Sequence, residues 1–465
     1  MNTKHPRIGF ANQKRGRFYP NIATVYVSLI KDDGYRGHSK YAGALHLGAM
    51  SKDTYYAHCR DIYAKMDTHY EICQEKIIDN IKDFYENKLG VVPEDGILQI
   101  EVSYDGSYAK RGFKSLHGMG YLVEVHTGFI VDFEVFSKYC EICQSHSNVE
   151  GEGCGHVWSG KSGQMEVEIA KILWRRSREN FGLEYHTMVA DADAAAYKAV
   201  KNVYGYGIRQ VKKELCLNHV SKRMKTRLLG IRNTYHNIIG VVKTGKRAGA
   251  ARKEYPLRTL LSDKDIDRLS NYYKGAIRKS LNLGVDEMRK KILATFDHHT
   301  SSHSRCPNNE WCEFKKAQAR GDPDPTKAIT NPPIFKDFPQ KAIQEIKVIF
   351  ETLADRSELS KCQKGYTSNQ NESLHSKLWT KARKDKYHGV ARIRFLAQVT
   401  ALEHNYSYED TCLLNSLNVG TSWELLKVLQ SEDQLKDIDG HKPPKKRKRT
   451  ETPTDAGPAY AAGRH

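Results

Sequence analysis

The sequence predicts an α/β protein whose core is a mixed β-sheet flanked by helices. Between residues 97 and 140, apolar and polar residues alternate in three short runs separated by glycine-bearing turns, a pattern typical of hairpin-linked strands. Before and after this region, apolar residues recur every three or four positions, which is typical of amphipathic helices. The order of these patterns along the chain therefore favours strands enclosed by helices over an all-α or all-β fold.

Each element of the predicted core follows from its own run of residues. The three strand runs are "ILQIEVSYDGSY", "HGMGYLVEVHTG" and "FIVDFEVFSKYC". A helical run, "GQMEVEIAKILWRRSRENFG", precedes a fourth strand, "YHTMVADAD", and a further helix, "AAAYKAVKNVYG". This β-β-β-α-β-α order is that of the ribonuclease-H-like fold, a mixed five-stranded sheet flanked by helices.

The remaining regions are mainly helical. In residues 39–88, helical runs with a break before Ser51 predict either a DNA-binding helix-turn-helix or a plain helical hairpin. We divide the first half of the chain into a basic flexible N-terminus (1–38), a helical region (39–95) and the first part of the core (96–220), which contains a cysteine-rich insertion (138–160). A basic all-α insertion follows (221–365), and then a helix that contains Glu372, the third acid discussed below, together with the C-terminal core helices (366–432). The last segment is a disordered tail (433–465).

The charge of the chain points to a polyanionic partner. Lysine and arginine number 74 against 55 acidic residues, and the formal net charge is +19. The cluster "KKRKR" near the C-terminus holds only five of the basic residues, so the excess is spread through the chain and favours nucleic acid. We expect neither a membrane span nor a secretory signal, because no apolar run is long enough and the N-terminus lacks an apolar segment. The ten cysteines are then expected to be reduced, some of them bound to metal.

Three acidic residues are candidate metal ligands. Asp105 ends the first strand in "VSYDGSY", and Asp191 ends the fourth in "MVADADAAAYKAV", where Asp193 is an alternative acid or a helix N-cap. Because the first and fourth strands are neighbours in the predicted fold, the two aspartates would face one another, and a cation between them would offset their repulsion. Glu372, in "TSNQNESLHSKLW", would be the third acid. Such an all-oxygen set suits magnesium (or manganese) and two-metal phosphodiester chemistry.

Four motifs resemble those of Mutator-like DDE transposases: "VSYDGSYAKRGFKSLHG", "ADADAAAYKAV", "CLNHVSKRM" and "TSNQNESLHSKLW", in this order. The likeness extends over residues 97–405 and is greatest to the animal Mutator-like or Kolobok-type group. It implies catalytic roles for Asp105, Asp191 and Glu372, since an Ala-aliphatic pair eight residues after the family's second aspartate selects Asp191 over Asp193. The family usually has asparagine at the position of His375.

Two cysteine and histidine patterns indicate further roles. The resemblance places Cys216 and His219 of "CLNHV" near the active site. In "YCEICQSHSNVEGEGCGH", a C-x2-C-x10-C-x-H spacing predicts a structural zinc site of Cys140, Cys143, Cys154 and His156. The segment "HHTSSHSRCPNNEWC" also offers five ligands, but its spacing is irregular, and we expect an ordinary loop there.

The basic residues suggest how DNA is bound and where the protein acts. Five residues of the insertion are predicted to contact phosphates: Arg223, Lys225, Arg227, Arg232 and Lys246. The run Lys445, Lys446, Arg447, Lys448 and Arg449 reads as a nuclear localisation signal, or as a nonspecific DNA-binding tail.

Together with the resemblance, these patterns predict a nuclear transposase that binds terminal inverted repeats and target DNA as a dimer or higher oligomer, and that cleaves and transfers DNA strands. The alternatives are a domesticated DNA-binding protein without catalysis, a nuclease of the same fold, and a zinc-stabilised chromatin module in which the acids are dispensable.

Overall fold

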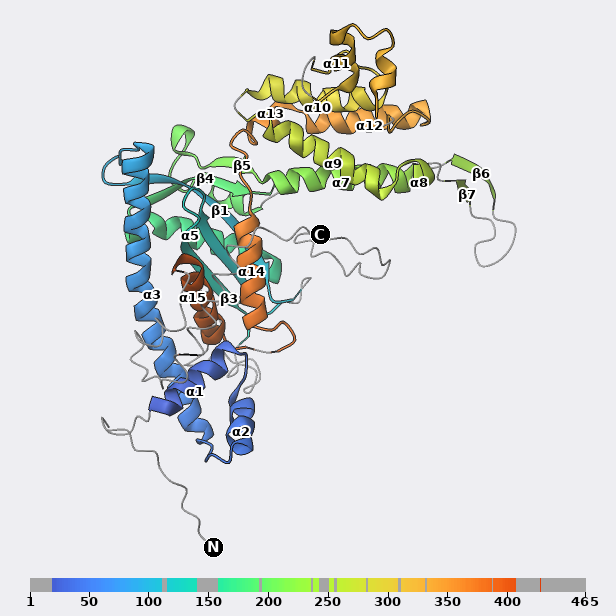
Figure 1. The fold of residues 1–465 in the computed structure, drawn as a ribbon. Coiled ribbons are helices and arrows are strands. Elements are labelled where there is room, and N and C mark those ends of the chain that lie inside the picture. The colour runs from blue at the N-terminus through green and yellow to red at the C-terminus, as the bar shows by residue number, and fades with distance from the viewer. Residues whose placement is uncertain are drawn as a thin grey trace. The chain divides into compact units, whose positions relative to one another are not determined.

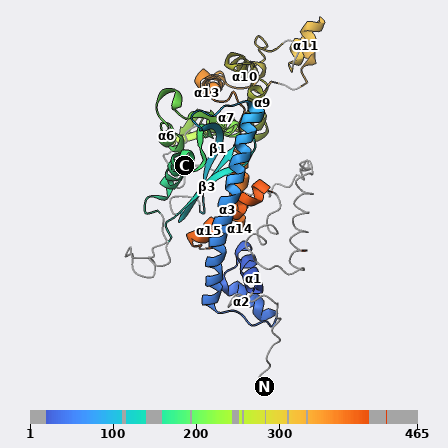
Figure 2. The ribbon, with the colours of Figure 1, turned by 90° about the vertical axis from the view of Figure 1, so that its left-hand side faces the viewer.

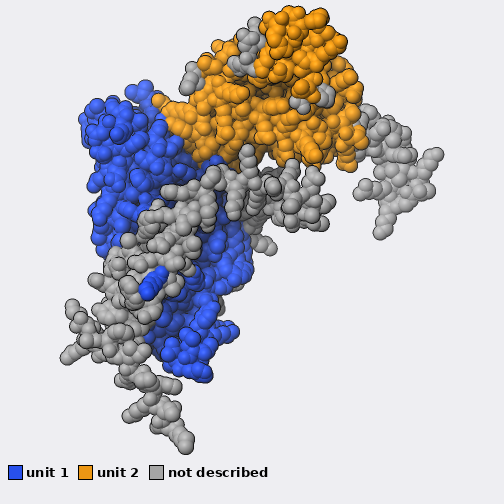
Figure 3. Space-filling model, in the orientation of Figure 1, with its two compact units in different colours: residues 1–186, 199–210, 369–465 blue, residues 187–198, 211–368 orange. Residues whose placement is uncertain are grey.

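The computed structural model describes residues 19–110, 115–139, 158–191, 195–235, 237–241, 251–254, 257–281, 283–307, 311–330, 333–386, 388–406 and 427. The chain divides into two compact units (Figure 3). The first comprises residues 1–186, 199–210 and 369–465, and the second comprises residues 187–198 and 211–368.

A mixed five-stranded sheet with strand order β3-β2-β1-β4-β5 confirms the predicted fold class (Figure 1). Its strands are β1 (Leu98–Tyr108), β2 (His117–Glu124), β3 (Ile130–Ser137), β4 (Leu183–Ala190) and β5 (Lys212–Leu215). β1, β2 and β3 form an antiparallel meander, whereas β4 and β5 pair in parallel. This arrangement is compatible with a ribonuclease-H-like fold.

Helices cover both faces of the meander, and every residue of β2 and β3 is buried as a result. On one face lies α5 (Met165–Phe181), whose Trp174 is fully buried against Tyr104 and Tyr185. On the other face, α14 (Asn369–Lys381) packs against β1 and β2, and α15 (Val390–Tyr406) packs against β3. Both sets of helices were predicted from their apolar spacing, including those that follow residue 366.

The N-terminal region differs from the prediction. The predicted flexible segment 1–38 contains α1 (Tyr19–Ile30), whose Val25 and Tyr26 are fully buried in the core, and the start of α2 (Tyr35–Ala44). Of the helical runs predicted in residues 39–88, the first ends earlier than the predicted break before Ser51, because α2 ends at Ala44. Ser51 caps the next helix by accepting a hydrogen bond from the Thr54 amide at 3.1 Å.

The helix that begins there, α3 (Lys52–Leu89), is one continuous helix of 38 residues (Figure 2). It buries a row of apolar residues beside α1 and α15, and it ends at Gly90, whose φ of 66° gives the left-handed cap. A helix-turn-helix made by α2 and α3 stays a prediction. Although α3 is long, no helix in the described residues is both long and apolar enough to cross a membrane.

The second unit contains β5, the last residues of β4 and one hairpin, and the rest of its described secondary structure is helical. Its α-helices are α6 (Ala195–Val200), whose last two residues belong to the first unit, α7 (Leu217–Thr234), α8 (Leu257–Leu260), α9 (Asp263–Arg278), α10 (Val285–His299), α11 (Glu313–Arg320), α12 (Gln340–Leu353) and α13 (Arg356–Ser360). α7, α9, α10 and α12 enclose a common apolar core. The hairpin of β6 (Asn237–Val241) and β7 (Ala251–Glu254) corrects the expectation of an entirely helical insertion.

Candidate active site

In the first unit, alternate residues of β1 contact successive turns of α14. The Ser103 hydroxyl donates to Asn371 Oδ1 at 2.7 Å, and Trp379 Nε1 donates to the Ser107 hydroxyl at 2.8 Å. Between them, His375 Nδ1 lies 3.6 Å from Asp105 Oδ2. These three contacts are called the β1–α14 ladder below.

The ladder has a simple geometric origin. Two residues of a strand advance about 6.6–6.8 Å, and four residues of an α-helix advance about 6 Å. Positions 103, 105 and 107 therefore keep nearly the same spacing as positions 371, 375 and 379. Because both series increase together, α14 runs along β1 in the same direction, and the side chain of Asp105 faces α14.

Asp105 is held beside buried groups and is still open to solvent. Its side chain is 25% exposed, whereas that of His375 is 4% exposed and stacks on the Tyr121 ring. Asn371 is fully buried, and its amide nitrogen also donates to the Tyr121 carbonyl at 2.9 Å. One side of the Asp105 carboxylate is thus fixed by packing, and the other is accessible to a ligand.

Asp105 does not end the first strand, as the sequence had predicted. Asp105 and Gly106 lie inside β1, paired with Tyr121 and Gly120, and the strand continues to Tyr108. A Cβ on Gly106 would lie 2.3 Å from Cγ of Glu166. Glycine is needed because α5 approaches this strand closely, on the face opposite α14.

Glu372 belongs to the first turn of α14, directly after Asn371 and one turn before His375. It is half-buried, and it lies next to the row of residues that contacts β1. The fixed position of Asn371 therefore limits where the Glu372 carboxylate can lie relative to β1. Trp379, which also belongs to that row, is buried, as expected for a packing residue.

A separate group of polar residues surrounds Asp191 in the second unit. Asp191 directly follows β4, and its carboxylate is in direct contact with Nδ1 of His219, in the first turn of α7. Cys216 caps this helix, and its amide donates to the Ala190 carbonyl at 3.3 Å. The Cys216 sulfur accepts hydrogen bonds from the amide and the hydroxyl of Ser368, at 3.3 and 3.2 Å.

These contacts shift the pKa values of the two α7 residues in opposite directions. Burial alone would lower the pKa of His219, but its hydrogen bonds to Asp191 and Cys216 raise it to about 10. Burial would raise the pKa of Cys216, but hydrogen bonds from His219 and Ser368 lower it to about 7. His219 is therefore a cation at neutral pH and holds one oxygen of Asp191.

The comparisons with known proteins bear on these two groups. A family model described as Mutator-like transposase matches residues 2–312, more than half of the chain. The chain belongs to the Mutator-like transposase family. No match was found among the curated proteins or the solved structures. The match is to the family as a whole, and the Kolobok-type subgroup stays a prediction.

The matched region of this transposase includes Asp105, Asp191, Cys216 and His219, and it ends before Glu372. The case for Glu372 therefore comes from its motif and from the β1–α14 ladder. Asp105 and Glu372 belong to the first unit and Asp191 to the second, and the contacts of each acid given above all lie within its own unit. In chemical terms, all three acids supply the oxygen ligands that Mg²⁺ prefers.

The predicted phosphate-binding residues of the transposase mostly have acidic partners. Arg223 pairs with Glu358 at 2.8 Å, Lys225 with Asp267 at 2.6 Å, and Arg232 with Asp263 at 2.5 Å. Arg227 is half-buried on the same helix. A DNA phosphate would therefore have to compete with these carboxylates, and phosphate contact stays a prediction.

Several predicted residues lie outside the described part of the chain. They are Asp193, the zinc set Cys140, Cys143, Cys154 and His156, Lys246, and the basic run 445–449. The sequence did not predict two of the contacts described above. Ser368 contacts Cys216, and the only signal for a role of Ser368 was its place in the motif "TSNQNES". His375 contacts Asp105, and the only signal there was that the family usually has asparagine at this position.

Proposed function

We propose that this chain is an active DDE transposase, which cleaves DNA at the ends of its element and joins the freed strand to target DNA. The β1–α14 ladder carries the proposal, because it aligns the turn that holds Glu372 with the strand that holds Asp105. The membership in the Mutator-like family supplies the reaction class. Asp191 follows β4, the neighbour of β1 in the strand order, and we propose that it completes the acidic set.

The three carboxylates would hold two divalent ions, magnesium or manganese. Bound ions of this kind activate an attacking oxygen and stabilise the leaving oxygen of a phosphodiester. The roles of the protein groups follow from their contacts: His219 fixes one oxygen of Asp191, and His375 lies against one oxygen of Asp105. The side chain of Asp191 is 47% exposed and that of Asp105 is 25% exposed, so both of these carboxylates have lone pairs accessible to a ligand.

The charge of the chain supports DNA as the substrate. With a net charge of +19, the protein would attract duplex DNA, and its affinity would fall steeply with salt. We propose terminal inverted repeats and target DNA as the duplexes bound, a dimer or higher oligomer as the acting species, and import into the nucleus through residues 445–449.

A strand-cleavage assay tests the proposal. Purified full-length protein is incubated with Mg²⁺ or Mn²⁺ and labelled duplexes taken from the genomic sequence that flanks its coding region. We expect cleaved and joined products, and a loss of about a thousandfold in Asp105→Asn, Asp191→Asn and Glu372→Gln, which corresponds to about 4 kcal/mol of transition-state stabilisation. Asp79→Asn, an exposed acid on α3, is the matched control.

Other outcomes separate the alternatives. Cleavage without joined products would favour a nuclease of this fold. DNA binding without cleavage, with every divalent ion tried, would favour a domesticated DNA-binding protein and contradict the proposal. Loss of activity in Asp193→Ala, with Asp191→Ala active, would show that the second acid is Asp193.

A further inference from the structure

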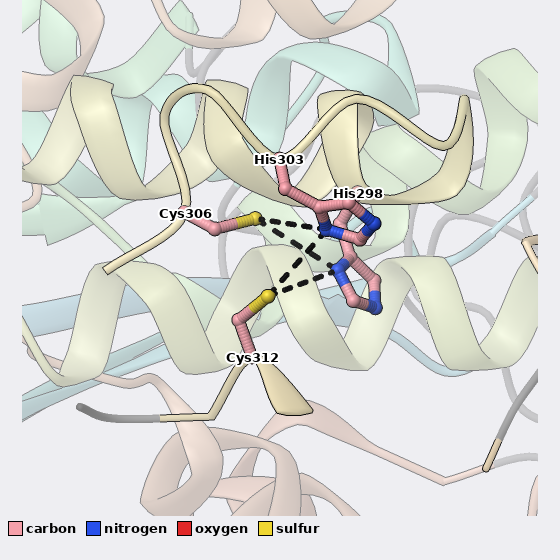
Figure 4. Close-up of side chains that lie close together, drawn as sticks. All are labelled: His298, His303, Cys306 and Cys312. Atoms are coloured by element: carbon pink, nitrogen blue, oxygen red, sulfur yellow. Dashed lines mark hydrogen bonds between the residues drawn. The ribbon is translucent and has the colours of Figure 1, made fainter. Parts of the chain in front are cut away.

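Four metal-ligating side chains meet in the second unit, and none of them is an acid of the proposed function. Among the described residues, His298, His303, Cys306 and Cys312 have ligand atoms that all lie within 4.8 Å of one another. Figure 4 shows the two sulfurs and the two imidazole rings turned toward a common centre. His298 comes from the last turn of α10, Cys312 caps α11, and the other two lie between these helices.

The spacing of the donor atoms fits a tetrahedral metal ion. The Cys306 sulfur lies 3.8 Å from Nδ1 of His298 and 3.9 Å from Nδ1 of His303. The Cys312 sulfur lies 3.8 and 3.5 Å from the same two nitrogens. With Zn–S near 2.3 Å and Zn–N near 2.0–2.1 Å, the sulfur-to-nitrogen edge of a tetrahedron is about 3.6 Å.

Packing fixes the two imidazoles in this orientation. The His303 ring stacks on Phe314, with centroids 4.2 Å apart and planes at 10°. The His298 ring meets Trp311 edge-on, with centroids 5.0 Å apart. Both histidines therefore present the same nitrogen, Nδ1, to both sulfurs. This shared orientation is expected of metal ligands and would be a coincidence in a group of polar side chains without a common role.

The surroundings of the two cysteines also suit a metal. Cys306 and Cys312 are buried and carry free thiols. A thiol that binds a metal must lose its proton, and a buried thiolate needs a cation or hydrogen-bond donors beside it. The Lys315 amide donates to the Cys312 sulfur at 3.4 Å, a contact that stabilises a thiolate.

We propose that His298, His303, Cys306 and Cys312 bind a structural zinc ion that ties the end of α10 to the start of α11. Two thiolates and two imidazoles close the tetrahedron and leave no position for a substrate, which is the pattern of structural zinc sites. The order of the ligands, His-x4-His-x2-Cys-x5-Cys, explains why the sequence predicted an ordinary loop.

The neighbouring His299 is excluded from this set by its packing. It is buried and stacks on Tyr272 instead, with ring centroids 5.7 Å apart. His299→Gln therefore provides a matched control: it removes an adjacent buried imidazole without removing a ligand.

Metal analysis of the full-length protein tests the site. The starting protein carries Cys140→Ser and Cys143→Ser, so that zinc held by the other predicted cysteine set does not contribute. We expect about one equivalent of zinc per chain in this background, lost on adding Cys306→Ser or Cys312→Ser. It should be retained with His299→Gln and with Cys362→Ser, which removes a buried thiol outside the cluster.

Replacement of zinc by Co²⁺ gives a readout that does not depend on folding of the variants. After removal of zinc, cobalt added to the starting protein should give the strong visible bands of a tetrahedral site with two thiolates. The same equivalent of zinc in Cys306→Ser and Cys312→Ser as in the controls, or a cobalt spectrum without thiolate bands, would overturn the proposal. Asp105→Asn should leave the zinc content unchanged, so this test and that of the transposase activity fail independently.

Discussion

His375 Nδ1 lies 3.6 Å from Asp105 Oδ2, and this contact is the middle one of the three that form the β1–α14 ladder. On either side of it, Ser103 and Ser107 make hydrogen bonds to Asn371 and Trp379. A helix one turn out of register would place Asn371 or Trp379 against Asp105 in place of His375. The ladder therefore gives His375 a role that the family's usual asparagine can also perform, because both side chains can donate an N–H to a carboxylate.

Replacing His375 should lower the proposed DNA cleavage without abolishing it. His375→Ala removes the group beside Asp105, and the partners of a metal ligand are typically worth 10–100-fold, so we expect a loss of about tenfold. His375→Asn should lose less, because its amide can still donate to the carboxylate. Cleavage rates measured over a range of Mg²⁺ concentrations check both. Ser376→Ala, an exposed neighbour on α14, is the control, and equal rates in His375→Ala and wild type would contradict the role.

His219 should be needed to position Asp191. His219→Gln removes the cation that holds one carboxylate oxygen, so the Mg²⁺ concentration for half-maximal cleavage should rise about 10–100-fold. Cys216→Ser keeps the helix cap but replaces the sulfur that contacts His219 and Ser368, and a smaller rise in the same direction is expected.

The Mg²⁺ dependence distinguishes positioning from a loss of folding. Thr226→Ala, an exposed residue on α7, is the control and should keep the wild-type Mg²⁺ requirement. If His219→Gln lowers the maximal rate with no change in the Mg²⁺ requirement, His219 does not act through Asp191.

Local patterns were enough to predict most of the core. The strands that became β1 to β3 were recognised by their alternation, β4 as a short strand between two helical runs, and α5, α14 and α15 by apolar residues at helical spacing. Alternation and helical spacing can be read from one segment alone, because they reflect which face of a single strand or helix is buried. The fifth strand was expected from the fold alone, because β5 has four residues and only one of them is buried. Similarly, α1 follows a basic segment whose composition hid a fully buried helix face.

Contacts between distant segments were out of reach of the sequence. Nothing near Asp105 indicates that residue 375 would lie beside it, and nothing near Cys216 indicates Ser368. The cluster of His298, His303, Cys306 and Cys312 was visible as a set of ligand types. Its convergence depends on how the segment after α10 folds back, which spacing rules for known zinc sites do not describe.

The amide of Asn371 should matter for stability. It is fully buried, accepts from the Ser103 hydroxyl and donates to the Tyr121 carbonyl. Asn371→Ala removes both of these buried hydrogen bonds, so the free energy of unfolding should fall by about 2–4 kcal/mol. Urea denaturation measures the change, and Ser373→Ala, exposed on the same helix, is the control. A change as small as that of the control would mean that α14 does not depend on this contact.

Acid should destabilise the fold through His117. Its ring is buried in β2, and burial, with a smaller effect from the charge of His388, lowers its pKa to about 4. The unfolded chain takes up a proton near pH 6.5, so it gains protons before the folded chain as the pH falls, and stability is lost between about pH 6.5 and pH 4. At about pH 5 the loss from this one residue is about 2 kcal/mol.

His117→Leu should remove that part of the pH dependence. Neither ring nitrogen of His117 has a hydrogen-bond partner among the described residues, so the substitution breaks no such bond. The free energy of unfolding is measured by urea denaturation at about pH 7.5 and about pH 5, where the other buried histidines titrate in both proteins and cancel. Wild type should lose about 2 kcal/mol more than His117→Leu between the two conditions, and His46→Asn, at an exposed position, controls for loss of a histidine. Equal losses in wild type and His117→Leu would mean that His117 is protonated in the folded protein at pH 5.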